Sequence, residues 1–155
     1  MPSRVLPFRQ SAGSKPSPRP VRVLIVDDDE NMRRFVDAIL RAAAFETTLA
    51  ADGDEALGIA ANAPRFDLLV TDEMMPRMAG HQLARYMRKR DRALKVLYLS
   101  GFRDHLFAVK GSLWVDEAFL DKPCTPEQLV HAVSMLLAGV AADSGAPSPD
   151  NAERV

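Results

Sequence analysis

Acidic residues follow two aliphatic runs of the sequence, and their placement indicates a site for a divalent cation. Asp27 and Asp28 begin an unbroken acidic stretch directly after LIV, and Asp72 comes directly after LLVT. Like charges about 4 Å apart repel by about 4 kcal/mol near a protein surface, so these carboxylates need a cation if they meet. A hard ion with oxygen ligands, Mg²⁺ by preference, would satisfy them and share its remaining positions with phosphate. The residues therefore predict a Mg²⁺ site at which a phosphoryl group is handled.

Further residues carry the groups that phosphoryl transfer uses. The reaction requires in-line positioning and neutralisation of charge. Asp72 offers a carboxylate oxygen as nucleophile, and Lys122 offers an ammonium to the transferring oxygens. Ser100 offers a hydroxyl hydrogen bond, and Gly101 leaves room beside it for the phosphoryl group. Pro123 directly after Lys122 raises the chance of a cis peptide bond, which would fix the direction of the lysine.

Alternating strands and helices are predicted to bring these residues together. Aliphatic runs predict strands, and amphipathic periodicity with caps predicts a helix after each strand. This alternation implies right-handed βαβ units and a doubly wound parallel sheet, which is an α/β fold. Such a sheet binds its ligands beyond the carboxyl ends of its strands. The strands are predicted at 21–27, 45–50, 66–72, 95–100 and 117–122, and the helices at 30–44, 52–63, 79–91, 102–117 and 125–139, the fourth helix being weak.

The composition predicts one soluble globular domain between two disordered ends. The 155 residues are 47% hydrophobic and 26% charged, with a formal net charge of −1 that gives no sign of nucleic-acid binding. The single Cys124 excludes an internal disulfide and a cysteine-based zinc cluster and fits a cytoplasmic location. No apolar run reaches the about 20 residues of a membrane helix. We expect a disordered Pro/Ser/Arg-rich leader over 1–20, a folded domain over 21–139 and a disordered polar tail over 140–155.

Four motifs resemble the receiver domain of bacterial response regulators, in the order of that family and at similar spacing. They are VLIVDDDENMRRF, LLVTDEMMPRMAG, LYLSG and FLDKP, and the similar region covers about 21–139. The resemblance implies a flavodoxin-like (βα)5 fold with strand order 2-1-3-4-5.

The same resemblance implies a role for each site residue. Asp72 would accept the phosphoryl group, and Lys122 would be the lysine of the family pattern. Ser100 would be the switch hydroxyl and Phe119 the switch aromatic residue. The ligands of Mg²⁺ would be Asp27, Asp28, Asp72 and the backbone carbonyl of Met74.

The chain departs from the family pattern around its predicted fourth helix. Val115 and Asp116 stand where the family often has a Gly-Ala pair, so we expect a short or irregular helix within 102–117. Trp114 and Phe107 are either packing residues or an exposed docking patch on this helix.

Other departures are smaller. Ala44 stands where the family often has glycine, and the Ser100-Gly101-Phe102 triplet is similar to receivers attached to hybrid sensor kinases. The three histidines lack metal-ligand spacing, and we interpret them as surface residues: His81, His105 and His131.

The resemblance implies a stand-alone switch in a two-component phosphorelay rather than an enzyme, with only limited chemistry on its own phosphate. A histidine kinase or histidine phosphotransfer protein would phosphorylate Asp72, after which Ser100 would move toward the phosphate and Phe119 would turn inward. The face of the predicted fourth helix, fifth strand and fifth helix would then select a protein partner. We expect no direct DNA binding, since only a short polar tail follows Gly139, and leave dimerisation open.

Two other functions compete with this interpretation. A Mg²⁺-dependent phosphohydrolase of the haloacid dehalogenase type would use Asp27 and Asp29 at D-x-D spacing, but Asn31 stands where Thr or Val is expected and no cap domain fits. A binding module without phosphate chemistry is the other alternative, although every chemical position is filled. Asp29 and Glu30 are also explained as first-turn acids of the next helix.

Overall fold

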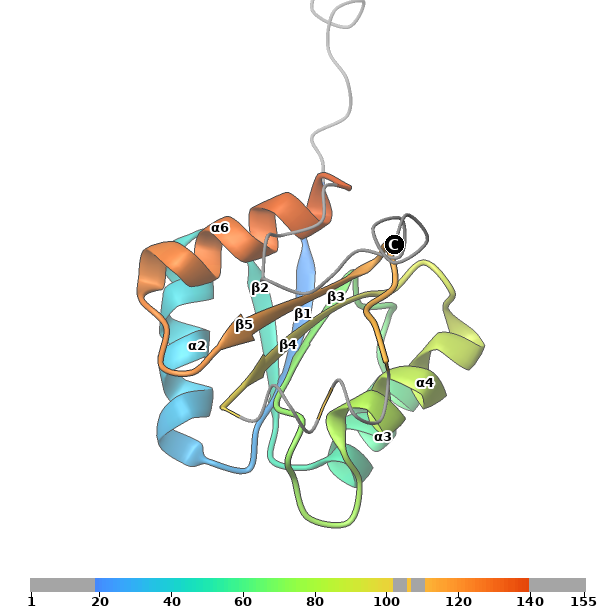
Figure 1. Cartoon of the computed structure of the whole chain (residues 1–155). Helices are drawn as coiled ribbons and strands as arrows, with labels where there is room; N and C mark the ends of the chain where they lie inside the picture. Colours follow the sequence, from blue (N-terminus) through green and yellow to red (C-terminus); the bar gives the residue numbers. More distant parts are fainter. Residues whose placement is uncertain (1–18, 102–105, 107–110, 140–155) are drawn as a thin grey trace, which may run out of the picture.

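The computed structural model describes residues 19–101, 106 and 111–139, and in them one parallel sheet forms the centre of the molecule. Its strands are β1 Arg22–Val26, β2 Glu46–Ala50, β3 Leu68–Thr71, β4 Lys95–Ser100 and β5 Glu117–Asp121. The strand order is β2-β1-β3-β4-β5, and all four pairings are parallel (Figure 1). The predicted flavodoxin-like fold and strand order are confirmed.

Helices cover both faces of this sheet. Among the described residues they are α2 Glu30–Ala42, α3 Gly53–Asn62, α4 Gly80–Arg90 and α6 Pro126–Leu137. α2 and α6 pack on one face, and α3 and α4 pack on the other (Figure 1).

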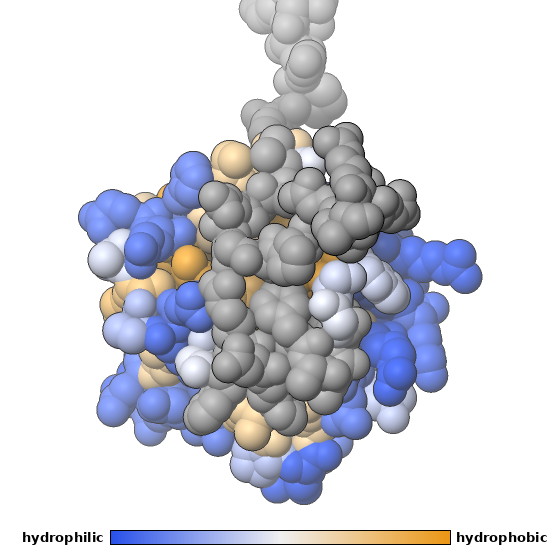
Figure 2. Space-filling model, viewed as in Figure 1, coloured by the Kyte–Doolittle hydropathy of each residue, from blue (hydrophilic) through white to orange (hydrophobic). Residues whose placement is uncertain are grey.

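The alternation of side chains along each strand builds two apolar layers. In β1, Leu24 and Val26 pack toward α3 and α4, while Val23 and Ile25 pack toward α2 and α6. All four are at most 1% exposed, which explains why this strand is a continuous aliphatic run. Figure 2 shows hydrophilic side chains over much of the outer flanks, outside these layers.

Local capping sets where the helices begin. The Asp29 side chain accepts from the backbone at the start of α2, and Asp52 does so for α3 through the N–H of Glu55. Before α6, Gln128 N donates to Thr125 Oγ1 at 3.1 Å, and Thr125 N donates to Gln128 Oε1 at 2.9 Å. These two reciprocal hydrogen bonds form a capping box at the start of α6.

The turn after α2 explains one departure from the family pattern. Ala44 has φ of 71°, in the left-handed region that glycine adopts with the least strain. The alanine therefore keeps the backbone conformation for which glycine is used, and the departure is one of sequence rather than of geometry.

The predicted fourth helix lies mostly outside the described residues. Leu106 is helical and buried, but residues 111–116 form bends and turns, so the predicted range 102–117 extended too far at its C-terminal end. The predicted tail and nearly all of the predicted leader also lie outside the described part. Within that part, no helix has both the length and the hydropathy to cross a membrane.

Candidate functional site

The carboxyl ends of β1 and β3 bring the predicted metal-binding aspartates together. Val26 pairs with Thr71 in the sheet, so Asp27 and Asp72 leave neighbouring strands side by side. Carboxylate oxygens of Asp27, Asp28 and Asp72 all lie within 4.8 Å of one another. We call these three residues the acidic cluster.

Lys122 reaches the acidic cluster from the segment after β5. Its Nζ lies 2.9 Å from Asp27 Oδ2 and 3.4 Å from Asp72 Oδ2. The peptide bond between Lys122 and Pro123 is cis. One ammonium thus contacts two of the three carboxylates, and the cluster keeps an excess of negative charge.

Burial changes the proton affinities of the paired groups. Asp27 is 3% exposed, and this burial raises its pKa although the hydrogen bond from Lys122 acts in the opposite direction. Burial alone would lower the pKa of Lys122, but its hydrogen bond with Asp27 and the charges of Asp27 and Asp72 raise it. Lys122 therefore stays a cation at neutral pH, while full ionisation of Asp27 is favoured by any further positive charge nearby.

Backbone groups hold the two buried aspartates in place. Asp29 N donates to Asp27 Oδ1 at 2.9 Å, and Met74 N approaches Asp72 Oδ1 at 3.4 Å. A Cβ at Gly80 would lie 2.2 Å from the carbonyl oxygen of Asp72, so the chain can pass there only as glycine. The position of Asp72 is therefore set by the loop that follows it.

The chemistry of the acidic cluster fits Mg²⁺. The ion prefers oxygen ligands and usually takes only one or two carboxylates with waters and phosphate. Asp28 is exposed and Asp72 is 8% exposed, so the cluster can be reached from solvent. Met74 follows in the same loop, and its carbonyl as a further ligand stays a prediction.

The two predicted switch residues lie on the neighbouring strands. Ser100 ends β4 and is 0% exposed, and Phe119 in β5 is 1% exposed. Phe119 pairs with Tyr98 in the sheet and belongs to the apolar layer under α3 and α4. Its ring is thus already inside the protein. This conformation is therefore the one that the expected inward turn would produce, not the one from which it would start. The switch roles of both residues stay predictions.

Comparison with known proteins decides the family. Residues 23–134 match the response regulator receiver domain family. The chain belongs to this family.

The chain covers different shares of its individual relatives. It is 35% identical to the response regulator MprA of Mycobacterium sp. (strain KMS) over 130 residues, and these residues make up 84% of this chain and 56% of that protein. It is 33% identical over 116 residues to the response regulator receiver protein CpdR of Brucella abortus (strain 2308), which is 75% of this chain and 96% of that protein. The crystal structure of the receiver domain from the hybrid histidine kinase CckA has a TM-score of 0.63 at 33% identity, with 75% of this chain and 98% of that chain covered.

Membership of the receiver family relates the acidic cluster to phosphorylation and Mg²⁺ binding. The receiver spans about half the length of the first curated relatives it matches, at 56%, and these are response regulators. Receiver domains of two-component systems are phosphorylated on an aspartate and depend on Mg²⁺. The oxygen ligands gathered in the cluster agree with that dependence.

The receiver also contains a buried polar contact that sequence reasoning missed. Glu73 is 0% exposed, and its Oε2 lies 2.6 Å from His81 Nδ1. The interpretation of His81 as a surface residue is therefore wrong, whereas His131 is exposed and His105 lies outside the described residues. Alternation along the chain could have indicated the contact, because Glu73 must face away from Asp72, toward the helix that carries His81.

A second missed contact joins α4 to β5. Arg88 Nη1 lies 2.5 Å from Glu117 Oε2, with the two side chains 10% and 1% exposed. Tyr98 Oη and Trp114 N also donate to Glu117, at 3.4 and 3.1 Å. Trp114 is 62% exposed, with the Arg88 guanidinium 5.3 Å from its ring centre, so it is not an interior packing residue. Phe107 lies outside the described residues.

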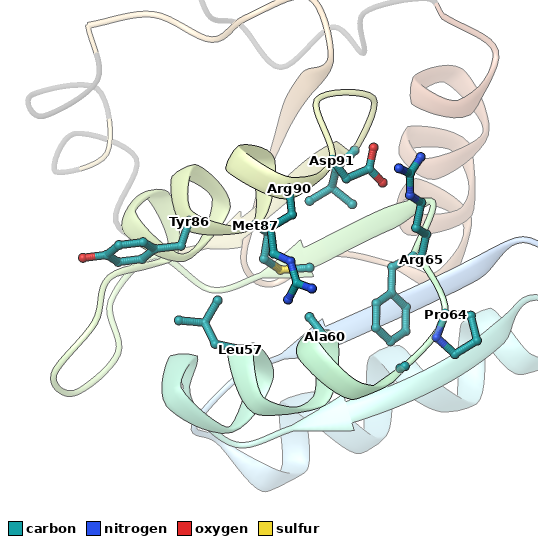
Figure 3. Close-up of a pocket in the computed structure, with 11 residues that line it drawn as sticks. Leu57, Ala60, Pro64, Arg65, Tyr86, Met87, Arg90 and Asp91 are labelled. Atoms are coloured by element: carbon teal, nitrogen blue, oxygen red, sulfur yellow. The ribbon is translucent and has the colours of Figure 1, made fainter.

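A cavity of about 230 Å³ lies between α3 and α4, away from the acidic cluster. Figure 3 shows Leu57 and Ala60 of α3 facing Met87 and Arg90 of α4 across it. None of the predicted site residues lines this cavity. It is therefore not the place where the phosphoryl group is handled.

Proposed function

We propose that this protein is a stand-alone receiver that accepts a phosphoryl group on Asp72 from a histidine kinase or a histidine phosphotransfer protein. The observation that carries the proposal is the meeting of Asp27, Asp28 and Asp72 with the ammonium of Lys122. The stand-alone form is supported by the likeness to CpdR, of which the chain covers 96%. The match to the longer MprA leaves the alternative of a receiver within a larger protein, which the proposal does not favour.

The transfer itself follows from the groups in the site. A carboxylate oxygen of Asp72 attacks the phosphorus of the donor's phosphohistidine, so that a P–O bond forms while the P–N bond breaks and its electron pair leaves with the imidazole. Lys122 Nζ, 3.4 Å from Asp72 Oδ2, is placed to neutralise charge on the transferred group. Mg²⁺ held by the acidic cluster would add positive charge at the phosphoryl oxygens.

Phosphorylation of Asp72 then acts as a switch rather than as a step of turnover. Ser100 at the end of β4 would donate its hydroxyl hydrogen bond to the phosphoryl group. Phe119 is already buried, so phosphate would stabilise this arrangement over one with the ring outside, rather than create it. The face of the predicted fourth helix, β5 and α6 would present the change to a downstream protein, without direct contact to DNA.

The contacts of Asp29 favour the receiver over a hydrolase of the haloacid dehalogenase type. That hydrolase would need Asp29 as its second catalytic acid beside Asp27. Asp29 Oδ1 instead accepts from Asn31 N at 2.9 Å and from Met32 N at 3.4 Å, as the cap of α2. An acid engaged by the helix is poorly placed to serve a leaving group.

Intact-mass measurement after incubation with acetyl phosphate and Mg²⁺ tests the proposal. We expect wild type to gain one phosphoryl group and Asp72→Ala to gain none. Asp54→Ala removes an acid of α3 whose side chain is 65% exposed and should behave as wild type. No uptake by folded wild type would indicate a binding module without phosphate chemistry. Hydrolysis of a phosphomonoester that survives Asp72→Asn and is lost in Asp27→Asn would indicate the hydrolase.

A further inference from the structure

The helix after the phosphoacceptor loop has no side-chain acceptor at its N-cap residue, although Gln82 Oε1 accepts from Ala79 N at 2.9 Å. α4 starts at Gly80, and its N-cap is Ala79, which has no side-chain acceptor. The N–H groups in the first turn of a helix need acceptors from outside the helix. Gly80 N donates to the Glu73 carbonyl at 3.0 Å, and His81 N donates to Glu73 Oε1 at 2.9 Å. Glu73, the residue next to Asp72, therefore caps α4.

His81 also holds the other oxygen of the same carboxylate. Its ring Nδ1 lies 2.6 Å from Glu73 Oε2, and the side chains are 22% and 0% exposed. A buried carboxylate is costly unless hydrogen-bond donors satisfy it, and here one residue supplies two of them. The loop between Glu73 and Gly80 is thus closed at its base by three hydrogen bonds.

This closed loop contains the predicted metal ligand Met74 and directly follows the proposed phosphoacceptor Asp72. Met74, whose carbonyl is the predicted further ligand of Mg²⁺, is the next residue after Glu73, and its N–H approaches Asp72 Oδ1 at 3.4 Å. The Asp72 carbonyl packs against Gly80 so closely that even a Cβ there would lie 2.2 Å from it. A shift of Glu73 relative to α4 would therefore move Asp72 and Met74 with it.

We propose that Glu73 and His81 are positioning residues for phosphoryl transfer, because their contact sets the Asp72 carboxylate and the Met74 backbone relative to α4. The inference rests on the proposed role of Asp72 as phosphoacceptor. Glu73 belongs to the side of the sheet that α4 covers, so neither residue touches the phosphoryl group. Their effect passes through the backbone, and a small misplacement of reacting groups is enough to slow a reaction strongly.

Three variants of His81 and His131 test the inference by two measurements: the Mg²⁺ dissociation constant from titration calorimetry, and the phosphorylation rate with acetyl phosphate at saturating Mg²⁺. His81→Ala should raise the dissociation constant and lower the rate, each about fivefold, since the loop base loses a hydrogen bond. His81→Asn keeps a donor near the position of Nδ1 and should stay within about twofold of wild type. His131→Ala removes an exposed histidine of α6 and should change neither value.

Separate outcomes distinguish the possible errors. If His81→Ala lowers the Tm but keeps the Mg²⁺ dissociation constant and the phosphorylation rate of wild type, Glu73 acts only as a helix cap. That outcome would overturn the inference. If His81→Ala does not fold, Glu73→Met, which keeps the side-chain length without an acceptor, is measured in the same way with the same criterion. If wild type takes up no phosphate, the proposed function fails, while the dissociation constants still decide whether His81 positions the metal ligands.

Discussion

Two of the partly or fully buried ion pairs among the described residues have similar geometry but a different balance of charge. Lys122 lies 2.9 Å from Asp27 but also serves Asp72, so one cation is shared among the carboxylates of the acidic cluster. Arg88 lies 2.5 Å from Glu117, and this pair is balanced one to one. Distance alone would describe both as salt bridges of the same kind.

The difference in charge balance corresponds to a difference between a binding site and a structural contact. The acidic cluster carries more negative than positive charge and is reached from solvent through Asp28, which suits a site that receives a cation and a phosphoryl group. Glu117 is 2% exposed and is satisfied by Arg88, Tyr98 and the backbone of Trp114. A buried pair of this kind stabilises one arrangement of α4, β4 and β5 and has nothing left to bind.

Removing one partner of the balanced pair should have the largest effect. Glu117→Ala leaves the Arg88 guanidinium buried without its carboxylate, which costs about 3–5 kcal/mol of unfolding free energy. That is a large share of the about 5–15 kcal/mol that stabilises a typical domain. Urea unfolding followed by circular dichroism measures it. The double variant Arg88→Met/Glu117→Leu should recover part of the loss, since it removes the buried unpaired charge but leaves Tyr98 Oη and Trp114 N without their acceptor. A loss as large as that of Glu117→Ala would contradict a cost that comes from the unpaired charge.

Metal addition should act on the acidic cluster alone. A ligand that binds only the folded protein stabilises it by about 2.7 kcal/mol at 100 times its dissociation constant. Mg²⁺ should therefore raise the Tm of wild type, and EDTA should reverse the increase. Asp54→Asn, in an exposed acid of α3, should respond as wild type does, and Asp72→Asn should respond weakly. An equal increase in Asp72→Asn would place the cation elsewhere.

Without metal, neutralising one acid of the cluster should have the opposite sign from the loss at Glu117. Asp72→Asn removes a like charge within 4.8 Å of two others, while Lys122 keeps its 2.9 Å contact with Asp27. We expect a gain of about 1 kcal/mol in unfolding free energy, as for relief of repulsion in a partly solvated site. Urea unfolding in EDTA measures it. A loss of stability would mean that Lys122 depends on both aspartates, and the contrast between the two regions would weaken.

The acidic cluster was predictable from sequence because the carboxyl ends of all strands in a parallel sheet lie at the same edge. An acid directly after an aliphatic strand must lie at the carboxyl edge of the sheet, and Asp27 and Asp72 both follow such strands. Strand order, the cation and the convergence of Lys122 followed from that rule together with the family motifs. The residue roles of Ser100 and Phe119 rest on the motifs alone.

The balanced pair and the Glu73–His81 contact were not predictable in the same way. Arg88 is one of three consecutive basic residues in the last turn of α4, and nothing local distinguishes it from its exposed neighbours. Its partner Glu117 follows residues 111–116, which form bends and turns and therefore carry no helical or strand period. Glu73 carried a weak signal, since alternation along the chain turns it away from Asp72 and toward the covering helix, but its partner becomes evident only when α4 is in place.

The smallest loss of unfolding free energy is expected for an ion pair that is exposed to solvent. Comparing it with the Arg88–Glu117 pair shows how much of the loss depends on burial. Arg34 Nη2 and Glu30 Oε2 form an i, i+4 pair on α2 with side chains 74% and 60% exposed. Arg34→Gln keeps helix propensity and should cost only about 0.2–0.5 kcal/mol of unfolding free energy, disappearing in 1 M salt. The Glu117→Ala loss should persist in the same salt, because its pair is shielded from solvent ions. If 1 M salt removed both losses equally, burial would not explain the difference in stability between the Arg88–Glu117 pair and the Arg34–Glu30 pair.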